Sequence, residues 1–123
     1  MRLLLDTQIL VWMITGDARL KPQWRDAIAA PETELEVSAV VACEYTDLQL
    51  RQRLPVEETI AELVARFELL IAALPGGAWT VLGSLPPIHR DPVDRMLVAH
   101  ALVEGQTLVT ADANIQRYPV DCL

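Results

Sequence analysis

The chain has 123 residues, of which 52% are hydrophobic, and this composition excludes a disordered protein and fits a single domain over residues 1–123. No apolar run reaches the roughly 18 residues that a membrane span needs, and Asp6 interrupts the apolar N-terminal stretch before it could serve as a signal peptide. The formal net charge is −7, opposite in sign to that of most nucleic-acid-binding proteins, although bound cations can invert the field at an acidic site. We therefore expect a soluble, cytoplasmic protein that has no membrane partner.

Strand-like and helix-like segments alternate along the chain, which predicts an α/β domain with a parallel sheet. In chain order, the expected elements are a strand at 2–5, helices at 7–14 and 22–30, a strand at 35–37, helices at 39–52 and 56–74, a strand at 79–82, a helix at 92–104, a strand at 107–110, a short helix at 113–118 and an edge strand at 120–123. Ser38, Asp91 and Asp112 stand where N-caps are expected, and Gly105 stands where the helix at 92–104 should end.

The clearest helical periodicity covers residues 56–74. Apolar side chains recur there at helical spacing, and the charged side chains lie mainly on the other face. The apolar positions are Val56, Ile60, Leu63, Val64, Phe67, Leu70, Ile71 and Leu74. The sequence Pro75-Gly76-Gly77 predicts the end of this helix.

Two carboxylates directly follow predicted strands. Asp6 ends the first strand, and Asp112 follows the strand at 107–110 by two residues. Because ligands of a doubly wound parallel sheet bind beyond the carboxyl ends of its strands, both acids are candidates for a binding site. Each also has a plainer interpretation as a helix N-cap.

Two further carboxylates share helix faces with apolar residues. Glu44 lies one turn from both Val40 and Leu48, and Asp94 heads an apolar stripe that continues at Leu97. Burying an unpaired carboxylate costs several kcal/mol, so each of these acids needs a partner. The alternatives to a metal ion are a salt bridge to an arginine for Glu44 and stabilisation of the helix N-terminus for Asp94.

Together these acids form one candidate metal site, whose members are Asp6, Glu44, Asp94 and Asp112. Mg²⁺ and Mn²⁺ prefer oxygen ligands, and carboxylates close to one another repel unless a cation lies among them. Such a site can activate water and stabilise the charge that develops on a phosphodiester.

Candidates for supporting roles are Thr7, Asp91, Arg95 and Thr110. The two threonines stand beside candidate acids and could orient a carboxylate or a water molecule. Arg95 follows Asp94 and could hold a phosphate as a bidentate donor. Asp91 precedes a proline and has the position of an ordinary N-cap. His89 could act as a general acid or base near pH 7, but a loop histidine is more often inert, so it is not counted as catalytic.

These residues stand in motifs that resemble those of the PIN-domain toxins of type II toxin–antitoxin systems, the VapC-like ribonucleases. The matching segments are residues 3–7, Ser38-Ala39 followed by Glu44, residues 89–95 with 97–99, and residues 104–105 with 108–112, followed by Tyr118. The third segment is the most specific of them, and the resemblance covers nearly the whole chain.

The resemblance implies a PIN-like three-layer α/β/α fold with a central parallel sheet of four to five strands. It also implies that Asp6, Glu44, Asp94 and Asp112 are the catalytic residues and hold Mg²⁺ or Mn²⁺. The activity implied is that of an endoribonuclease, which hydrolyses structured or single-stranded RNA with metal-activated water. The partners implied are a second copy of the chain, as a homodimer, and a small antitoxin in a hetero-oligomer that reaches operator DNA only through the antitoxin.

The chain departs from that family's pattern at Cys43, where Trp is common, at Leu48, where Lys is common, and at Gln8, where His is common in this subgroup. The family also usually has a further short helix between the positions of Leu82 and Pro86. None of these departures removes a metal-binding acid, but they bear on how RNA is held.

The missing lysine leaves two interpretations open: weaker phosphate binding, or compensation by an arginine such as Arg51. If catalysis is weakened, the chain could instead be a PIN-like module kept for binding an antitoxin or operator complex. The presence of all four acids favours the enzyme. A phosphorylatable receiver domain is disfavoured because only Asp6 follows the first strand and the sole lysine, Lys21, is wrongly placed.

Overall fold

A four-stranded, wholly parallel sheet forms the centre of the fold, in a computed structural model that describes residues 1–123. Its strands are β1 (Arg2–Leu5), β2 (Glu34–Ser38), β3 (Leu70–Ala72) and β4 (Thr107–Val109), in the spatial order β3-β2-β1-β4. The three leucines of β1 are completely buried, as expected for a central strand that is covered on both faces. The parallel sheet predicted from the alternation of segments is thereby confirmed.

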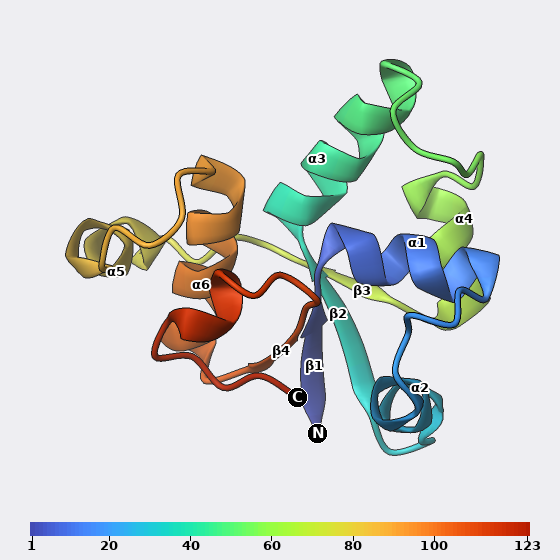
Figure 1. Cartoon of the computed structure of the whole chain (residues 1–123), viewed down its shortest axis with the longest axis horizontal. Helices are drawn as coiled ribbons and strands as arrows, with labels where there is room; N and C mark the ends of the chain where they lie inside the picture. The colour runs from blue at the N-terminus through green and yellow to red at the C-terminus, as the bar shows by residue number, and fades with distance from the viewer.

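Six helices flank the sheet and complete three α/β/α layers. They are α1 (Thr7–Thr15), α2 (Pro22–Ala29), α3 (Ala39–Leu50), α4 (Ile60–Phe67), α5 (Ala78–Ser84) and α6 (Pro92–Glu104), and a 3₁₀ turn, η1 (Ile115–Arg117), follows β4. Figure 1 shows α1, α2 and α4 gathered on one side of the sheet and α5 and α6 on the other, with α3 rising from the end of β2. None of these helices combines the length and the apolar character that crossing a bilayer requires.

The helix ends follow the capping residues read from the sequence. The Ser38 hydroxyl accepts a hydrogen bond from the Val40 amide at the start of α3, and the Asp91 carboxylate accepts one from the Val93 amide at the start of α6. Gly105 ends α6 in the left-handed conformation, with φ of 62°, which a residue with a side chain rarely adopts.

The helix predicted over residues 56–74 is wrong at both ends. A reciprocal cap between Thr59 and Glu62 starts α4 only at Ile60, and Glu68 ends it in the left-handed conformation. The following residues 70–72 pair with residues 36–38 of β2 as the edge strand β3. The helical prediction extended over residues 70–72 because their apolar side chains also fit the spacing of a helix. Over three residues, an apolar strand cannot be told from a turn of amphipathic helix by its pattern.

Two other segments also differ from expectation. Residues 79–82 were expected to form a strand, but they lie in α5, so a short helix does precede Pro86. The final edge strand reduces to one parallel bridge between Leu108 and Cys122, and the helix at 113–118 reduces to the single turn η1. Trp79 lies on α5 with 74% of its surface exposed, so the β-forming preference of its side chain did not produce a strand here.

Candidate active site

Asp6 is the first residue after β1 and occupies the N-cap of α1, with only 8% of its surface exposed. One carboxylate oxygen accepts the Thr7 backbone N–H at 2.7 Å, and the other accepts the Thr110 hydroxyl at 2.7 Å. Both donors are neutral. The carboxylate is therefore held rigidly at the carboxyl end of the sheet, but no positive side chain of the protein pairs with it.

Glu44 reaches the same place from α3. Its Oε1 accepts the Thr7 hydroxyl at 2.7 Å, so Thr7 contacts Asp6 through its backbone and Glu44 through its side chain. The two threonines that stand beside acids in the sequence thus orient carboxylates, which is one of the supporting roles expected for them.

One cavity of about 410 Å³ collects most of the predicted acids. Asp6, Glu44, Asp91 and Asp94 line it together with Arg53. These acids come from the end of β1, the middle of α3 and the start of α6. Residues far apart in sequence therefore converge where the resemblance placed a metal site.

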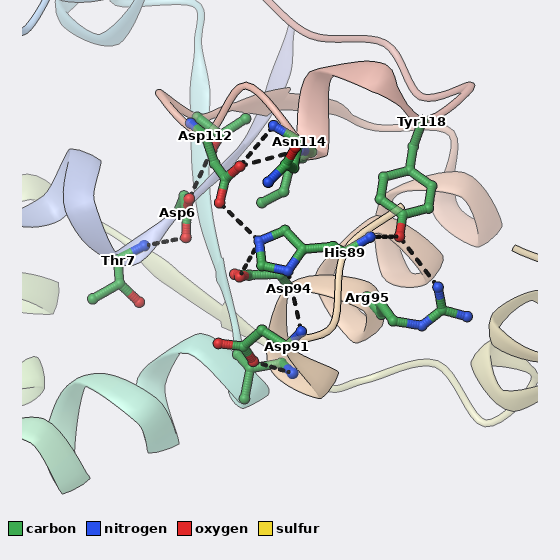
Figure 2. Close-up of polar contacts among 12 residues, drawn as sticks. Asp6, Thr7, His89, Asp91, Asp94, Arg95, Asp112, Asn114 and Tyr118 are labelled. Atoms are coloured by element: carbon green, nitrogen blue, oxygen red, sulfur yellow. Dashed lines mark hydrogen bonds and ion pairs between the residues drawn. The ribbon is translucent and has the colours of Figure 1, made fainter. Parts of the chain in front are cut away.

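Asp112 joins this group through His89. The His89 Nε2 atom lies 3.0 Å from Oδ2 of Asp94 and 2.9 Å from Oδ2 of Asp112, so the ring stands between the two carboxylates (Figure 2). The Asp91 backbone N–H donates to Nδ1 of the same ring at 3.1 Å. Because Nδ1 accepts a hydrogen bond, Nε2 is the nitrogen that carries the proton between the two acids.

Crowding and burial disfavour the charged forms of three acids. Burial, with the nearby charges of Asp6 and Asp91, raises the pKa of Asp94 from 3.8 to about 7. Burial is also the main cause that raises the pKa of Asp6 and of Glu44, and the hydrogen bonds from the two threonines only partly oppose it. A site that strains carboxylates in this way favours a bound cation.

Asp112 behaves differently. Burial alone would raise its pKa, but the hydrogen bond from His89 and those from two backbone amides, of Asn114 and Ile115, outweigh burial and lower it. The contact with Asp112 is in turn the main cause that raises the pKa of His89.

The residues present fit a hard divalent cation. Carboxylate oxygens of Asp94 and Asp112 lie within 4.8 Å of each other and of His89 Nε2, and Asp94 also faces the cavity that holds Asp6 and Glu44. The candidate donors are carboxylate oxygens, as Mg²⁺ and Mn²⁺ prefer, and the protonated Nε2 of His89 positions two of these carboxylates without being a ligand itself.

The two other supporting candidates have structural roles. Asp91 caps α6, as its position before Pro92 indicated, although it also lines the cavity. The Arg95 guanidinium donates to the carbonyl oxygens of Leu82 at 3.1 Å and of Pro86 at 2.9 Å, and to the Tyr118 hydroxyl. It thereby secures the segment that leads to His89 and does not line the acidic cavity, so the phosphate contact considered for it stays a prediction.

Two residues at the site were not predicted from the sequence. His89, a loop histidine that the sequence does not mark as catalytic, contacts two of the four acids, and its only sequence signal is its position within the third motif. Arg53 lines the cavity, whereas Arg51, the suggested substitute for the missing lysine, forms an ion pair with Asp47 at 3.1 Å. No spacing rule identifies Arg53, because it lies in the turn after α3.

A three-layer α/β/α fold with an acidic cavity at the carboxyl ends of its parallel strands defines the class of domain. Residues 3–121 match the sequence profile of the family described as "PIN domain". The chain belongs to the PIN-domain family. A search of curated protein sequences found no match to it.

Solved structures of VapC-type proteins share the fold at low sequence identity. VapBC2 from Rickettsia felis, bound to a DNA fragment from its promoter, superposes with a TM-score of 0.73 at 20% identity, covering 100% of this chain and 98% of that one. VapBC-1 from nontypeable Haemophilus influenzae gives 0.62 at 15% identity, with 100% and 97% covered. Mycobacterium tuberculosis VapC20, a toxin that cleaves the sarcin–ricin loop, gives 0.64 at 20% identity, with 93% and 92% covered.

Proposed function

We propose that the chain is a Mg²⁺- or Mn²⁺-dependent endoribonuclease that acts as the toxin of a type II toxin–antitoxin pair. One observation carries the proposal: Asp6, Glu44 and Asp94 share one cavity, and Asp112 joins them through His89. Three of these carboxylates have raised pKa values, mainly because they are buried. A carboxylate with a purely structural role is normally either exposed to solvent or paired with a cationic side chain. Buried carboxylates that lack such a pair are typical of a metal site.

In the proposed reaction, Asp6, Glu44, Asp94 and Asp112 hold the cation. A bound divalent ion activates water for attack on a phosphodiester and stabilises the charge that develops on the phosphate. Thr7 and Thr110 keep the carboxylates in place through short hydrogen bonds. His89 holds a proton at Nε2 between two acids and orients both of them.

The antitoxin partner is proposed by similarity. Two of the structures with the same fold are named as VapBC proteins, and one of these is bound to promoter DNA. We extend this to a small antitoxin for the present chain, which would link it to operator DNA, and to a homodimer or hetero-oligomer in the cytoplasm. The net charge of −7 favours a basic antitoxin segment.

A second candidate is a binding module with weakened catalysis, which the departures at Cys43 and Leu48 favour. The two candidates differ in a cleavage assay. Purified, antitoxin-free protein is incubated with a mixed RNA pool in Mg²⁺, in Mn²⁺ and in EDTA, beside Asp94→Asn. The exposed acid Asp26 on α2 offers a matched control as Asp26→Asn.

We expect cleavage that requires the metal, disappears in Asp94→Asn and persists in Asp26→Asn. Cleavage that survives EDTA would contradict the proposed metal dependence. The absence of cleavage by folded protein in either metal would favour the binding module. For the toxin role, expression of the wild type should arrest growth, and expression of Asp94→Asn should not.

A further inference from the structure

The acidic cavity adjoins a second cavity along α1. The second cavity has a volume of about 400 Å³ and shares Gln8, Val11, Arg53 and Leu54 with the first. It continues past Thr15 to Arg19. Each volume falls within the roughly 300–1,000 Å³ of ordinary ligand pockets, so the two together form a groove that starts at Asp6 and follows α1.

Arg53 is the cation at the junction of the two cavities, and it has no anionic partner. It forms no ion pair and no side-chain hydrogen bond, although its backbone N–H is fixed by the Leu48 carbonyl at 2.8 Å. Four other arginines are paired with carboxylates: Arg2, Arg19, Arg51 and Arg66. A guanidinium placed beside an acidic cavity but left unpaired is available to an anion of a bound ligand.

The far end of the groove carries a flat guanidinium surface. The Arg19 guanidinium lies over the Trp12 ring, 5.1 Å from its centroid, and three hydrogen bonds to the Asp17 carboxylate hold Arg19 in place. A guanidinium fixed in this way offers a plane on which a base can stack.

We propose that Arg53 binds a backbone phosphate of single-stranded RNA adjacent to the phosphodiester that is cleaved, so that the strand leaves the acids along α1 towards Arg19. This inference rests on the proposed ribonuclease function. Phosphates repeat along the strand, and an acidic cavity needs a cation beside it to retain such a polyanion. Arg53 would thus provide the phosphate contact for which the resembling family commonly has a lysine at the position of Leu48.

The lining of the groove favours a nucleic acid over a peptide. Three of the ten residues around the first cavity and three of the nine around the second are hydrophobic. A more apolar cavity lies outside this groove, between α3 and α6 around Val40 and Met96. A polar groove with one free guanidinium suits the phosphate and sugar of a strand, whereas a peptide partner gains most from apolar pockets.

The test measures binding of a short, fluorescein-labelled single-stranded RNA of mixed sequence by anisotropy over a range of salt concentrations. All proteins carry Asp94→Asn, which prevents cleavage during the measurement. Arg53→Gln and Arg53→Lys are compared with Arg51→Gln, a matched exposed arginine two residues away that pairs with Asp47. Melting temperatures confirm that each variant is folded.

We expect Arg53→Gln to weaken RNA binding about tenfold and to reduce the slope of log K against log salt by about 0.7, the value for one phosphate contact on a single strand. Arg53→Lys should keep the salt slope and bind RNA with intermediate affinity, because lysine retains the positive charge but not the two parallel N–H donors of a guanidinium. Arg51→Gln should have the same RNA affinity and the same salt slope as its parent. In the cleavage-competent protein, Arg53→Gln should raise KM with little change in kcat.

RNA binding by Arg53→Gln with the affinity and salt slope of its parent would overturn the inference and leave the groove to a protein partner. A parent that binds no RNA would overturn it as well. Failure of the proposed function is seen separately, as an absence of metal-dependent cleavage by the wild type whatever Arg53 does.

Discussion

Glu36 and Asp6 are both buried carboxylates next to the central strand β1, with 2% and 8% of their surfaces exposed, but they have different partners. The Glu36 carboxylate accepts hydrogen bonds from Arg2 Nε at 2.8 Å and from Gln106 Nε2 at 2.7 Å. A cationic side chain of the protein itself therefore compensates its charge. Asp6 accepts hydrogen bonds only from neutral donors, and the nearby charges that act on its pKa are those of other acids.

The comparison separates a carboxylate whose charge is compensated within the fold from one whose charge is not. Burying a charge is tolerated when the fold supplies an opposite charge, as Arg2 does for Glu36. Around Asp6 the fold supplies more negative charge, from Asp91 and Asp112, and no opposite charge. Burial alone therefore does not distinguish the two carboxylates, whereas the presence or absence of an internal cation does.

The largest expected difference is in catalysis. Asp6→Asn should reduce metal-dependent RNA cleavage by more than about 100-fold, because removing even an outer contact of a metal site costs about 10–100-fold. Glu36→Gln should cleave at close to the wild-type rate, since its partners belong to the chain. Initial rates on one labelled RNA measure both variants. Equal losses of cleavage rate in Asp6→Asn and Glu36→Gln would contradict the distinction between the two carboxylates.

The next difference is in stability. Glu36→Leu should lower the free energy of unfolding by about 2 kcal/mol, because the buried Gln106 Nε2 loses its acceptor while Oε1 of the same amide already has no partner. The double variant Glu36→Leu with Gln106→Leu should recover most of this loss, since both polar groups are then removed. Urea denaturation of the three proteins measures the effect. A double variant as unstable as the single one would show that Glu36 and Gln106 stabilise the fold through side-chain packing and not through their hydrogen bond.

A smaller effect concerns pH in the metal-free protein. The folded pKa of Asp94, about 7, lies above its ordinary value of 3.8, so its contribution to stability is complete below pH 3.8 and is lost as the pH rises through 7. At pH 8, Asp94→Asn should therefore raise Tm by about 4 °C, the shift that roughly 1 kcal/mol causes in a domain of this size.

Differential scanning calorimetry in EDTA measures this effect, and Asp26→Asn is the control. The difference between Asp94→Asn and the wild type should shrink as the pH falls to 4 and should disappear below pH 3.8, where Asp94 is protonated in both the folded and the unfolded state. A wild type that gains stability between pH 4 and pH 7 relative to Asp94→Asn would reverse the predicted sign.

Much of the fold was accessible from sequence because the signals were local. Buried leucines before Asp6, the Ser38 and Asp91 caps and Gly105 each act over a few residues, and the structure confirms them. The segment at 56–74 was not accessible, because pairing with β2, a contact about 34 residues away, decides that residues 70–72 form a strand. Local periodicity contains no information about such pairing.

The candidate site divides in the same way. Strand ends and apolar helix faces indicated Asp6, Glu44, Asp94 and Asp112, and the structure brings these acids together around one cavity and His89. The contacts of Arg95, His89 and Arg53 depend on loops whose paths the sequence does not reveal. Their roles therefore emerged only from the positions of their side chains.

The central claim is that the carboxylates around Asp6 hold a divalent cation that Glu36 does not need. Isothermal titration of metal-free protein with Mn²⁺ tests it most directly, with wild type, Asp6→Asn and Glu36→Gln measured side by side. We predict saturable binding by the wild type and by Glu36→Gln, and binding at least about tenfold weaker in Asp6→Asn. Equal Mn²⁺ binding by all three proteins, or none by the folded wild type, would contradict the claim.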